Sequence, residues 1–194
     1  SGTGGLGNSP IHDLVSDPTN PNRFYAAVER DAIYVTNDAG LTWTDVSSTD
    51  AIIQPLITNG GNNNTEMAVA SNGRLYMSVI INGQPQYIGF SDNQGTTWTQ
   101  MDLPVTPESN GDNEGLSPRV KPGGQGAIHF SIVADPVNPN IVYVAGDRQD
   151  SPFTNFIGAN NFSGRIFRGD TTRAAGGPTA VPSPQWDHMT HSDS

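Results

Sequence analysis

The sequence predicts an all-β protein made of repeated four-stranded antiparallel units, on the basis of its composition and two internal repeats. Among 194 residues there are 22 glycines and 15 prolines, and only 14% of residues are charged. That balance favours strands joined by tight turns over surface helices, which need many Glu, Lys, Ala and Leu residues. No segment shows a sustained helical period of apolar residues, and the chain is long enough to bury a core.

The first repeat is an eight-residue turn motif at residues 36–43 and 91–98, 55 residues apart. Both copies fit the pattern Ser/Thr-x-Asp/Asn-x-Gly-x-Thr-Trp. The hydroxyl and the Asp or Asn side chain can bond to backbone N–H groups, and Gly can take the positive φ that the reversal requires. The closing Trp is expected to return to the core, where its indole N–H would find a backbone acceptor. The predicted turn residues are Thr36, Asp38, Gly40, Thr42, Trp43, Ser91, Asn93, Gly95, Thr97 and Trp98.

The second repeat is Asp-Pro-x-Asn-Pro-Asn, at residues 17–22 and 135–140, followed each time by an apolar segment. Residues before Pro favour extended conformations and Asn tolerates left-handed ones, so the motif predicts a reversal between strands. Together the repeats predict three units of four strands each. The strands of the first unit lie at 11–16, 23–28, 32–36 and 42–46, and those of the second at 65–71, 74–81, 86–91 and 97–101. The strands of the third unit lie at 127–134, 141–145, 165–168 and 185–189. The units span about 9–50, 51–105 and 127–190, with a long loop at 106–126, and belong to one domain covering 1–194.

These turns, at this spacing, resemble the BNR or Asp-box propeller superfamily, which includes sialidases, xyloglucanase-type glycoside hydrolases and sortilin-like receptors. The resemblance covers about residues 11–186 and implies a β-propeller with four-stranded antiparallel blades. Propellers usually close with about four to eight blades, so three units predict a partial propeller. The remaining blades would come from the same longer chain or from association of chains. The motif is a structural turn, so it does not transfer an activity.

Charge and cysteine content restrict the classes of partner. A net charge of −10 would repel a phosphate backbone, so nucleic acid is not expected as a partner. Apolar runs are too short for membrane insertion. The chain has no cysteine and its surface is rich in Asn and Gly, which is typical of bacterial secreted proteins; an extracellular or cell-surface location is expected. A signal peptide, if there is one, lies outside this chain.

Two carboxylates stand at matching points of the first and third units. Glu29 and Asp147 each lie four residues after the tyrosine that follows the second repeat, and Arg30 and Arg148 come next as candidate binding residues. Xyloglucanase-type hydrolases, which this pattern resembles, place an acidic residue at a similar point, so the pair could act as acid and base on a glycosidic bond. The middle unit has Ile80 there, and acidic residues are also ordinary in exposed turns.

Other patterns carry less information. The sequence lacks the arginine motif of sialidases, and the integrin-type tripeptide at residues 168–170 is interpreted as a turn between strands. His12 and His129 are interpreted as structural histidines on first strands. No metal site or cofactor is predicted, although calcium could bind the oxygen-rich loops at 59–64 and 108–115.

The function that these observations favour is a propeller module that binds a glycan or a protein partner without catalysis. A glycoside hydrolase using Glu29 and Asp147 is the first alternative. An adhesin or structural scaffold is the second.

Overall fold

Strands dominate the structure, a computed structural model that describes residues 4–107, 113–115, 125–149, 153–154, 158–177 and 180–190. Within them the strands form three four-stranded antiparallel sheets and one two-stranded sheet. Sheet 1 contains β1 (Ile11–Ser16), β2 (Phe24–Val28), β3 (Ile33–Thr36) and β4 (Thr44–Asp45). Sheet 2 contains β5 (Asn62–Val69), β6 (Leu75–Ile81), β7 (Gln84–Ser91) and β8 (Thr99–Gln100). Sheet 3 contains β11 (Ser131–Ala134), β12 (Ile141–Arg148), β13 (Gly164–Asp170) and β14 (Trp186–His188).

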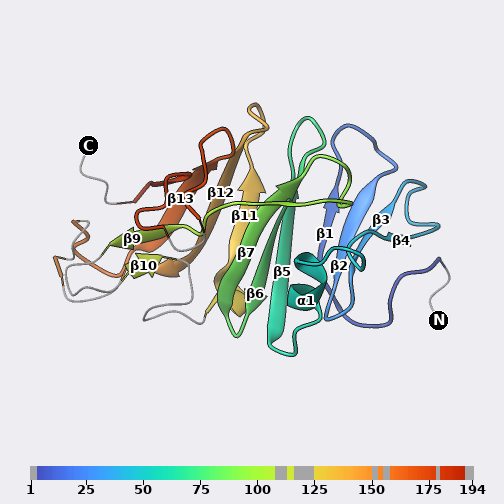
Figure 1. The fold of residues 1–194 in the computed structure, drawn as a ribbon, viewed down its shortest axis with the longest axis horizontal. Coiled ribbons are helices and arrows are strands. Elements are labelled where there is room, and N and C mark those ends of the chain that lie inside the picture. Colours follow the sequence, from blue (N-terminus) through green and yellow to red (C-terminus); the bar gives the residue numbers. More distant parts are fainter. Residues whose placement is uncertain are drawn as a thin grey trace.

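The three sheets stand side by side in chain order, with sheet 2 in the middle (Figure 1). In each sheet the strands are hydrogen-bonded in the order in which they occur in the chain. The first strands β1 and β11 both contact β5, so the first strands share one edge of the assembly. This confirms the prediction of three four-stranded antiparallel sheets.

Sheet 2 is buried on both faces, as the alternation along β6 shows. Tyr76 and Ile80 belong to the core cluster shared with sheet 3. Met77 and Val79 belong to the cluster shared with sheet 1. Successive side chains of a strand point to opposite faces, so a nearly continuous apolar segment can supply two cores at once.

Both eight-residue turns have the predicted hydrogen bonds. The Asp38 carboxylate accepts a bond from the Thr42 backbone N–H at 2.8 Å, and the Gly40 N–H donates to Thr36 Oγ1 at 3.0 Å. In the second turn the Thr97 N–H donates to Asn93 Oδ1 at 2.9 Å. The glycines have positive φ, at 90° for Gly40, and so do the residues before them. The turns are therefore held by side-chain acceptors in the way that the sequence predicts.

Two of the three tryptophans join neighbouring sheets. Trp98 of sheet 2 packs on the cluster that includes sheet 1, and Trp186 of sheet 3 belongs to the cluster that includes sheet 2. Trp43 of sheet 1 packs against a small cluster together with Leu6 from the N-terminal segment. The Trp186 indole N–H donates to the carbonyl oxygen of Asp102 at 2.6 Å. The expectation of a backbone acceptor is wrong for Trp98, whose buried indole N–H has no hydrogen-bond partner among the described residues.

The Asp-Pro-x-Asn-Pro-Asn segments both reverse the chain. The Asp17 N–H donates to the carbonyl oxygen of Arg23 at 3.0 Å, and the Asp135 N–H donates to that of Ile141 at 3.0 Å. Side-chain oxygens of the two aspartates accept further backbone N–H bonds inside each turn. The matching sequences therefore form matching turns.

Two local predictions differ from the structure, and one short helix was not predicted. The expected strand at 127–134 starts with the short helix α2 (Gly126–His129), and only β11 is extended, so His129 is not on a strand. The expected loop at 106–126 contains a hairpin in which β9 (Val105–Pro107) pairs with β10 (Asn113–Gly115). A second short helix, α1 (Ile53–Ile57), covers the start of sheet 2.

The position of α2 has a tertiary cause. The Gly126 N–H donates to the carbonyl oxygen of Gly83 at 2.7 Å, in the turn between β6 and β7. A Cβ atom at position 126 would lie 2.6 Å from that oxygen, so the close approach requires glycine. A contact across more than forty residues therefore decides this helix, and local sequence patterns do not reveal it.

Candidate functional site

The predicted residues of sheets 1 and 3 lie at corresponding ends of their sheets, beyond the second strand. Glu29 and Arg30 lie in the turn after β2, whereas Asp147 and Arg148 are still part of β12. Strand β12 continues through an irregularity in its pairing with β13 between Ala145 and Arg148. An extra residue in one strand re-aims the neighbouring side chains. The two positions are thus similar in topology and different in local structure.

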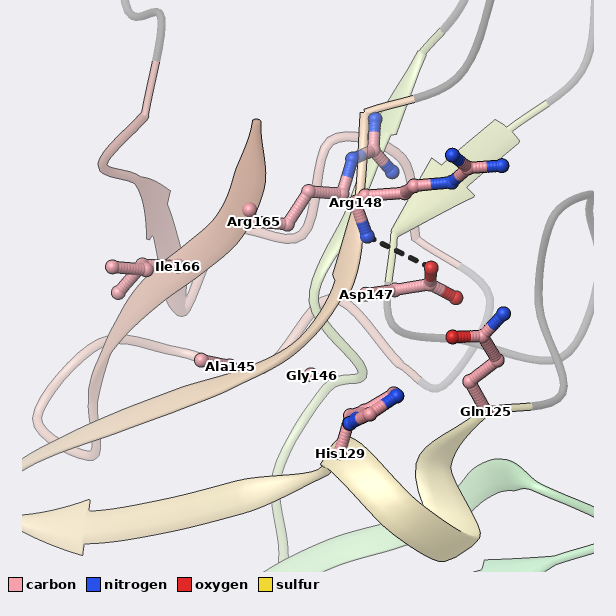
Figure 2. A pocket seen from close by; sticks show the side chains of 9 residues that line it. Gln125, His129, Ala145, Gly146, Asp147, Arg148, Arg165 and Ile166 are labelled. Carbon is pink, nitrogen blue, oxygen red and sulfur yellow. Dashed lines mark hydrogen bonds between the residues drawn. The ribbon is translucent and has the colours of Figure 1, made fainter. Parts of the chain in front are cut away.

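A cavity of about 400 Å³ opens beside Asp147 (Figure 2). Its walls come from α2, the end of β12 and the start of β13. Figure 2 shows the side chains of Asp147 and Gln125 pointing toward each other, with the His129 imidazole on the same side. The described residues that line it are Gln125, His129, Ala145, Gly146, Asp147, Arg148, Gly164, Arg165 and Ile166. The volume lies within the range of small-molecule sites, roughly 300–1,000 Å³.

Arg165 supplies a buried charge to this cavity. Its residue is only 2% exposed, and its Nε donates to Gln149 Oε1 at 3.1 Å. Its guanidinium also contacts Thr106 Oγ1 of β9 at 3.4 Å. A buried guanidinium is tolerated when it is hydrogen-bonded. Arg165 therefore ties the hairpin of β9 and β10 to sheet 3 and holds one wall of the cavity in place.

Two exposed phenylalanines lie next to the cavity. The Arg148 guanidinium lies over the Phe162 ring, 4.3 Å from its centroid. The ring of Phe153 meets Phe162 edge to face, with centroids 4.9 Å apart and planes at 83°. Phe162 is 51% exposed and Phe153 is 36% exposed. Aromatic rings that remain this exposed offer an apolar surface beside the cavity.

The surroundings of Glu29 are different. Its carboxylate lies 3.5 Å from Arg30 Nε, and the Arg30 Nε also donates to the carbonyl oxygen of Asn62 at 3.4 Å. Arg30 has a positive φ of 53°, which is uncommon for a residue with a Cβ atom. Burial lowers the pKa of the neighbouring His12, and Arg30 lowers it further while Glu29 opposes the shift.

A second pair of acidic residues, Asp13 and Glu66, lies on the first strands of sheets 1 and 2. Burial raises the pKa of Glu66, and the charge of Asp13 raises it further. The Asn64 amide opposes this shift by donating to the Glu66 carboxylate at 3.0 Å. The Asp13 carboxylate accepts a bond from the Met67 N–H at 2.7 Å, so it is used to join β1 to β5.

The structure does not bring the predicted carboxylates together in one cavity. Glu29 is not among the described residues that line the cavity beside Asp147. Sheet 2 stands between the two, since it shares one core cluster with sheet 1 and the other with sheet 3. Arg148 joins Asp147 at the cavity, whereas Arg30 stays with Glu29.

Sequence reasoning missed Gln125, Phe153, Phe162 and the role of His129 in lining the cavity. Three phenylalanines, at positions 153, 156 and 162, within a segment rich in Asn, Gly and Ser were the signal that could have pointed to an exposed aromatic surface. His129 could not be found, because its position depends on the tertiary contact that forms α2.

The integrin-type tripeptide is not a turn. It forms the end of β13, where Gly169 packs under the Trp186 ring and Arg168 contacts Asp187 at 3.4 Å. The Asp170 carboxylate accepts a bond from the Thr172 hydroxyl at 2.6 Å. Its residues serve the sheet, so we do not assign them to recognition.

Among the described residues, no group of three or more His, Asp or Glu side chains could hold a metal ion. Residues 108–112 of the second oxygen-rich loop lie outside the described part of the chain, so calcium binding stays a prediction. None of the described helices has the length and apolar character needed to cross a bilayer.

The chain thus has the blade-like sheets of a β-propeller, with a cavity that Asp147, Gln125 and His129 line and an aromatic surface at one end of sheet 3. No family model matches the sequence, and no curated protein matches it significantly. Solved structures that it resembles include YCF48 from Cyanidioschyzon merolae, with a TM-score of 0.55 and 13% identity over 93% of this chain and 39% of that one. They also include the GH74 xyloglucanase from Xanthomonas campestris, with a TM-score of 0.50 and 16% identity over 92% of this chain and 21% of that one.

Both of these neighbours are β-propellers. At such low identity the likeness concerns the fold alone. The chain spans well under half the length of either neighbour.

Proposed function

We propose that this chain is a glycan-binding module of the Asp-box propeller type that acts without catalysis. The cavity beside Asp147 carries the proposal. It combines a carboxylate acceptor, an amide, an imidazole and a guanidinium, which can together bond to several hydroxyl groups. A concave site with a few convergent polar groups suits a small ligand better than it suits a protein partner.

The spacing of the carboxylates argues for binding without hydrolysis. Stacked sheets lie about 10 Å apart, so two spacings separate Glu29 from Asp147 by something on the order of 20 Å. Inverting glycosidases need about 6.5–9.5 Å between their carboxyl groups, and retaining enzymes need about 5–5.5 Å. A glycoside hydrolase using this pair is therefore the weaker alternative.

A pair of variants tests the proposal. Soluble protein would be screened on an array of plant, microbial and animal glycans, and every bound glycan would be checked for cleavage. Asp147→Ala should weaken binding at least tenfold, because it removes an acceptor from the cavity. Glu29→Gln is the matched control and should bind like the wild type.

Two results would overturn this proposal. One is the absence of binding to any glycan. The other is glycan cleavage that disappears in both Asp147→Ala and Glu29→Gln, since this would establish the hydrolase alternative.

The proposal includes further blades and an extracellular or cell-surface location. Sheet 3 leaves Val133, Ile166 and Met189 at 58%, 41% and 49% exposed, respectively. Register pairs Val133 with Tyr143 and Ile166 with Ala145, which puts their side chains on the face opposite the core shared with sheet 2. Another sheet, from a longer chain or from a second copy, would cover this face. The two sources can be distinguished by comparing the sedimentation of this chain alone with that of the full-length native protein.

A further inference from the structure

We propose that Asn59 is a site of spontaneous deamidation, in which its side chain reacts with the backbone of Gly60. The Gly60 nitrogen attacks the side-chain carbonyl carbon of Asn59, and a C–N bond forms there. The bond from that carbon to the side-chain nitrogen breaks, and this nitrogen leaves with the Gly60 proton as ammonia. Water then opens the cyclic imide to aspartate or isoaspartate. The reaction needs no reagent other than water, and it is independent of the proposed glycan binding.

Asn-Gly pairs are the least hindered sites for this reaction, because glycine has no side chain beside the attacking nitrogen. The described part of the chain contains three such pairs, at 59–60, 72–73 and 82–83, and a fourth at 110–111 lies outside it. A free glycine N–H can lose its proton and turn toward the side chain, whereas a bonded one must first give up its partner. The three described pairs can therefore be ranked by the state of the glycine N–H.

Only the first pair leaves that N–H free. The Gly73 N–H donates to the carbonyl oxygen of Ala70 at 2.9 Å, and the Gly83 N–H donates to Asn63 Oδ1 at 3.2 Å. The Gly60 N–H has no hydrogen-bond partner within the part of the chain that the structure describes. Gly60 is also exposed, and nothing lies within 4 Å of the place that a Cβ atom would take. The backbone there has room to turn, and water can reach it.

The side chain of Asn59 is prepared for the attack. Its Oδ1 accepts a bond from the Gly61 N–H at 2.8 Å. Negative charge develops on this oxygen when the Gly60 nitrogen attacks, and a donor already directed at the oxygen stabilises that charge. Asn72 Oδ1 has a similar donor, the Arg74 N–H at 3.0 Å, so the state of the glycine N–H is what separates the two sites.

Isoaspartate at position 59 would lengthen the main chain by one methylene group in the turn between α1 and β5. Two hydrogen bonds span the modified link. The Asn62 N–H donates to the carbonyl oxygen of Asn59 at 2.9 Å, and the buried Asn62 amide donates to that of Ile57 at 2.8 Å. The isoaspartate form should therefore unfold at a lower urea concentration than the unmodified chain. Asn59→Asp has the new charge without the methylene, and it should retain the wild-type midpoint.

The experiment incubates the folded chain at mildly alkaline pH and follows each asparagine by tandem mass spectrometry. Isoaspartate is identified by its methylation with an isoaspartyl methyltransferase. Asn59 should react about fivefold faster than Asn72 or Asn82, which is the factor by which breaking one hydrogen bond of ordinary strength slows a reaction. In concentrated urea, where all three glycine N–H groups are free, the three sites should react at similar rates.

Two variants test the cause of the difference. Gly60→Ala places a Cβ atom in open space, so the fold should be unchanged, and it should suppress the reaction at Asn59. Asn63→Ala removes an exposed side chain that is the acceptor of the Gly83 N–H, and it should accelerate the reaction at Asn82 about fivefold. Circular dichroism checks that both variants keep the wild-type fold.

The proposal is overturned if Asn59 in the folded chain reacts no faster than Asn72 and Asn82, or if Gly60→Ala leaves the rate at Asn59 unchanged. An unchanged rate at Asn82 in Asn63→Ala would also contradict it, because the glycine N–H would then not control the reaction.

Discussion

Replacing tryptophan by phenylalanine should cost more stability at position 186 than at position 98, although the two residues play matching roles between sheets. The Trp186 N–H donates to a backbone oxygen at 2.6 Å, and the residue is 6% exposed. The buried Trp98 N–H has no hydrogen-bond partner among the described residues. Phenylalanine removes the N–H in both cases, and much of the loss of ring size cancels in the comparison.

The magnitudes follow from the hydrogen bonds. Trp186→Phe loses a bond worth about 0.5–1.5 kcal/mol and leaves the Asp102 oxygen without that donor. Trp98→Phe removes an unsatisfied donor whose burial costs about 1–3 kcal/mol. The free energies of unfolding of the two variants should therefore differ by about 1.5–4.5 kcal/mol. For a chain of this size that corresponds to roughly 3–18 °C in Tm.

Urea unfolding followed by circular dichroism measures both values, provided that fluorescence gives the same transition and the urea dependence of the free energy is unchanged. The reasoning is refuted if Trp98→Phe destabilises the protein as much as Trp186→Phe does. Such a result would mean that the Trp98 N–H is satisfied in solution.

Three further variants test the turns and the contacts between sheets. Hydrogen bonds from the Thr42 side chain and backbone lower the pKa of Asp38 to about 2. The contribution of Asp38 to stability should therefore be present above about pH 4 and disappear as the pH falls toward about 2. Asp38→Asn should remove this pH dependence, as measured by urea unfolding at each pH. Gly169→Ala would place a Cβ atom 2.7 Å from the buried indole ring of sheet 3 and should cost about 1–3 kcal/mol in chemical denaturation, whereas Gly164→Ala, with nothing within 4 Å, should stay within about 0.5 kcal/mol of wild type. Arg74→Met should cost about 2 kcal/mol, because the Arg74 Nη1 donates at 2.9 and 2.8 Å to the side chains of Asn140 and Thr171 in the turns beside sheet 3. Arg173→Met breaks an exposed ion pair and should cost less than about 1 kcal/mol, so equal thermal shifts would contradict this difference.

Local chemistry explains why the turns were predictable. The hydroxyl, the carboxylate or amide, and the glycine of each eight-residue motif interact within that motif, so the sequence contains both partners. The same holds for Asp135, whose carboxylate accepts N–H bonds from the two residues that follow the proline. Strand periodicity is also local, and β1 begins and ends where the pattern predicts.

The positions of the candidate residues relative to one another were predicted only in part, and their roles stay a prediction. Asp147 and Arg148 do lie at a cavity, but Glu29 and Arg30 lie at another sheet. Matching positions in a repeat identify equivalent places in two sheets. They do not say whether those places face one another, because that depends on how the sheets are stacked.

The sequence by itself determined the turns, the alternation of the strands and the number of four-stranded sheets, because each depends on residues within a few positions of one another. Only the tertiary structure decided that α2 interrupts the expected strand, that Trp98 lacks the acceptor that Trp186 has, and that Phe162 lies beside Arg148 at a cavity. Each of these features depends on the relative positions of separate segments in the packed sheets, and residue types and spacing in the chain do not determine those positions.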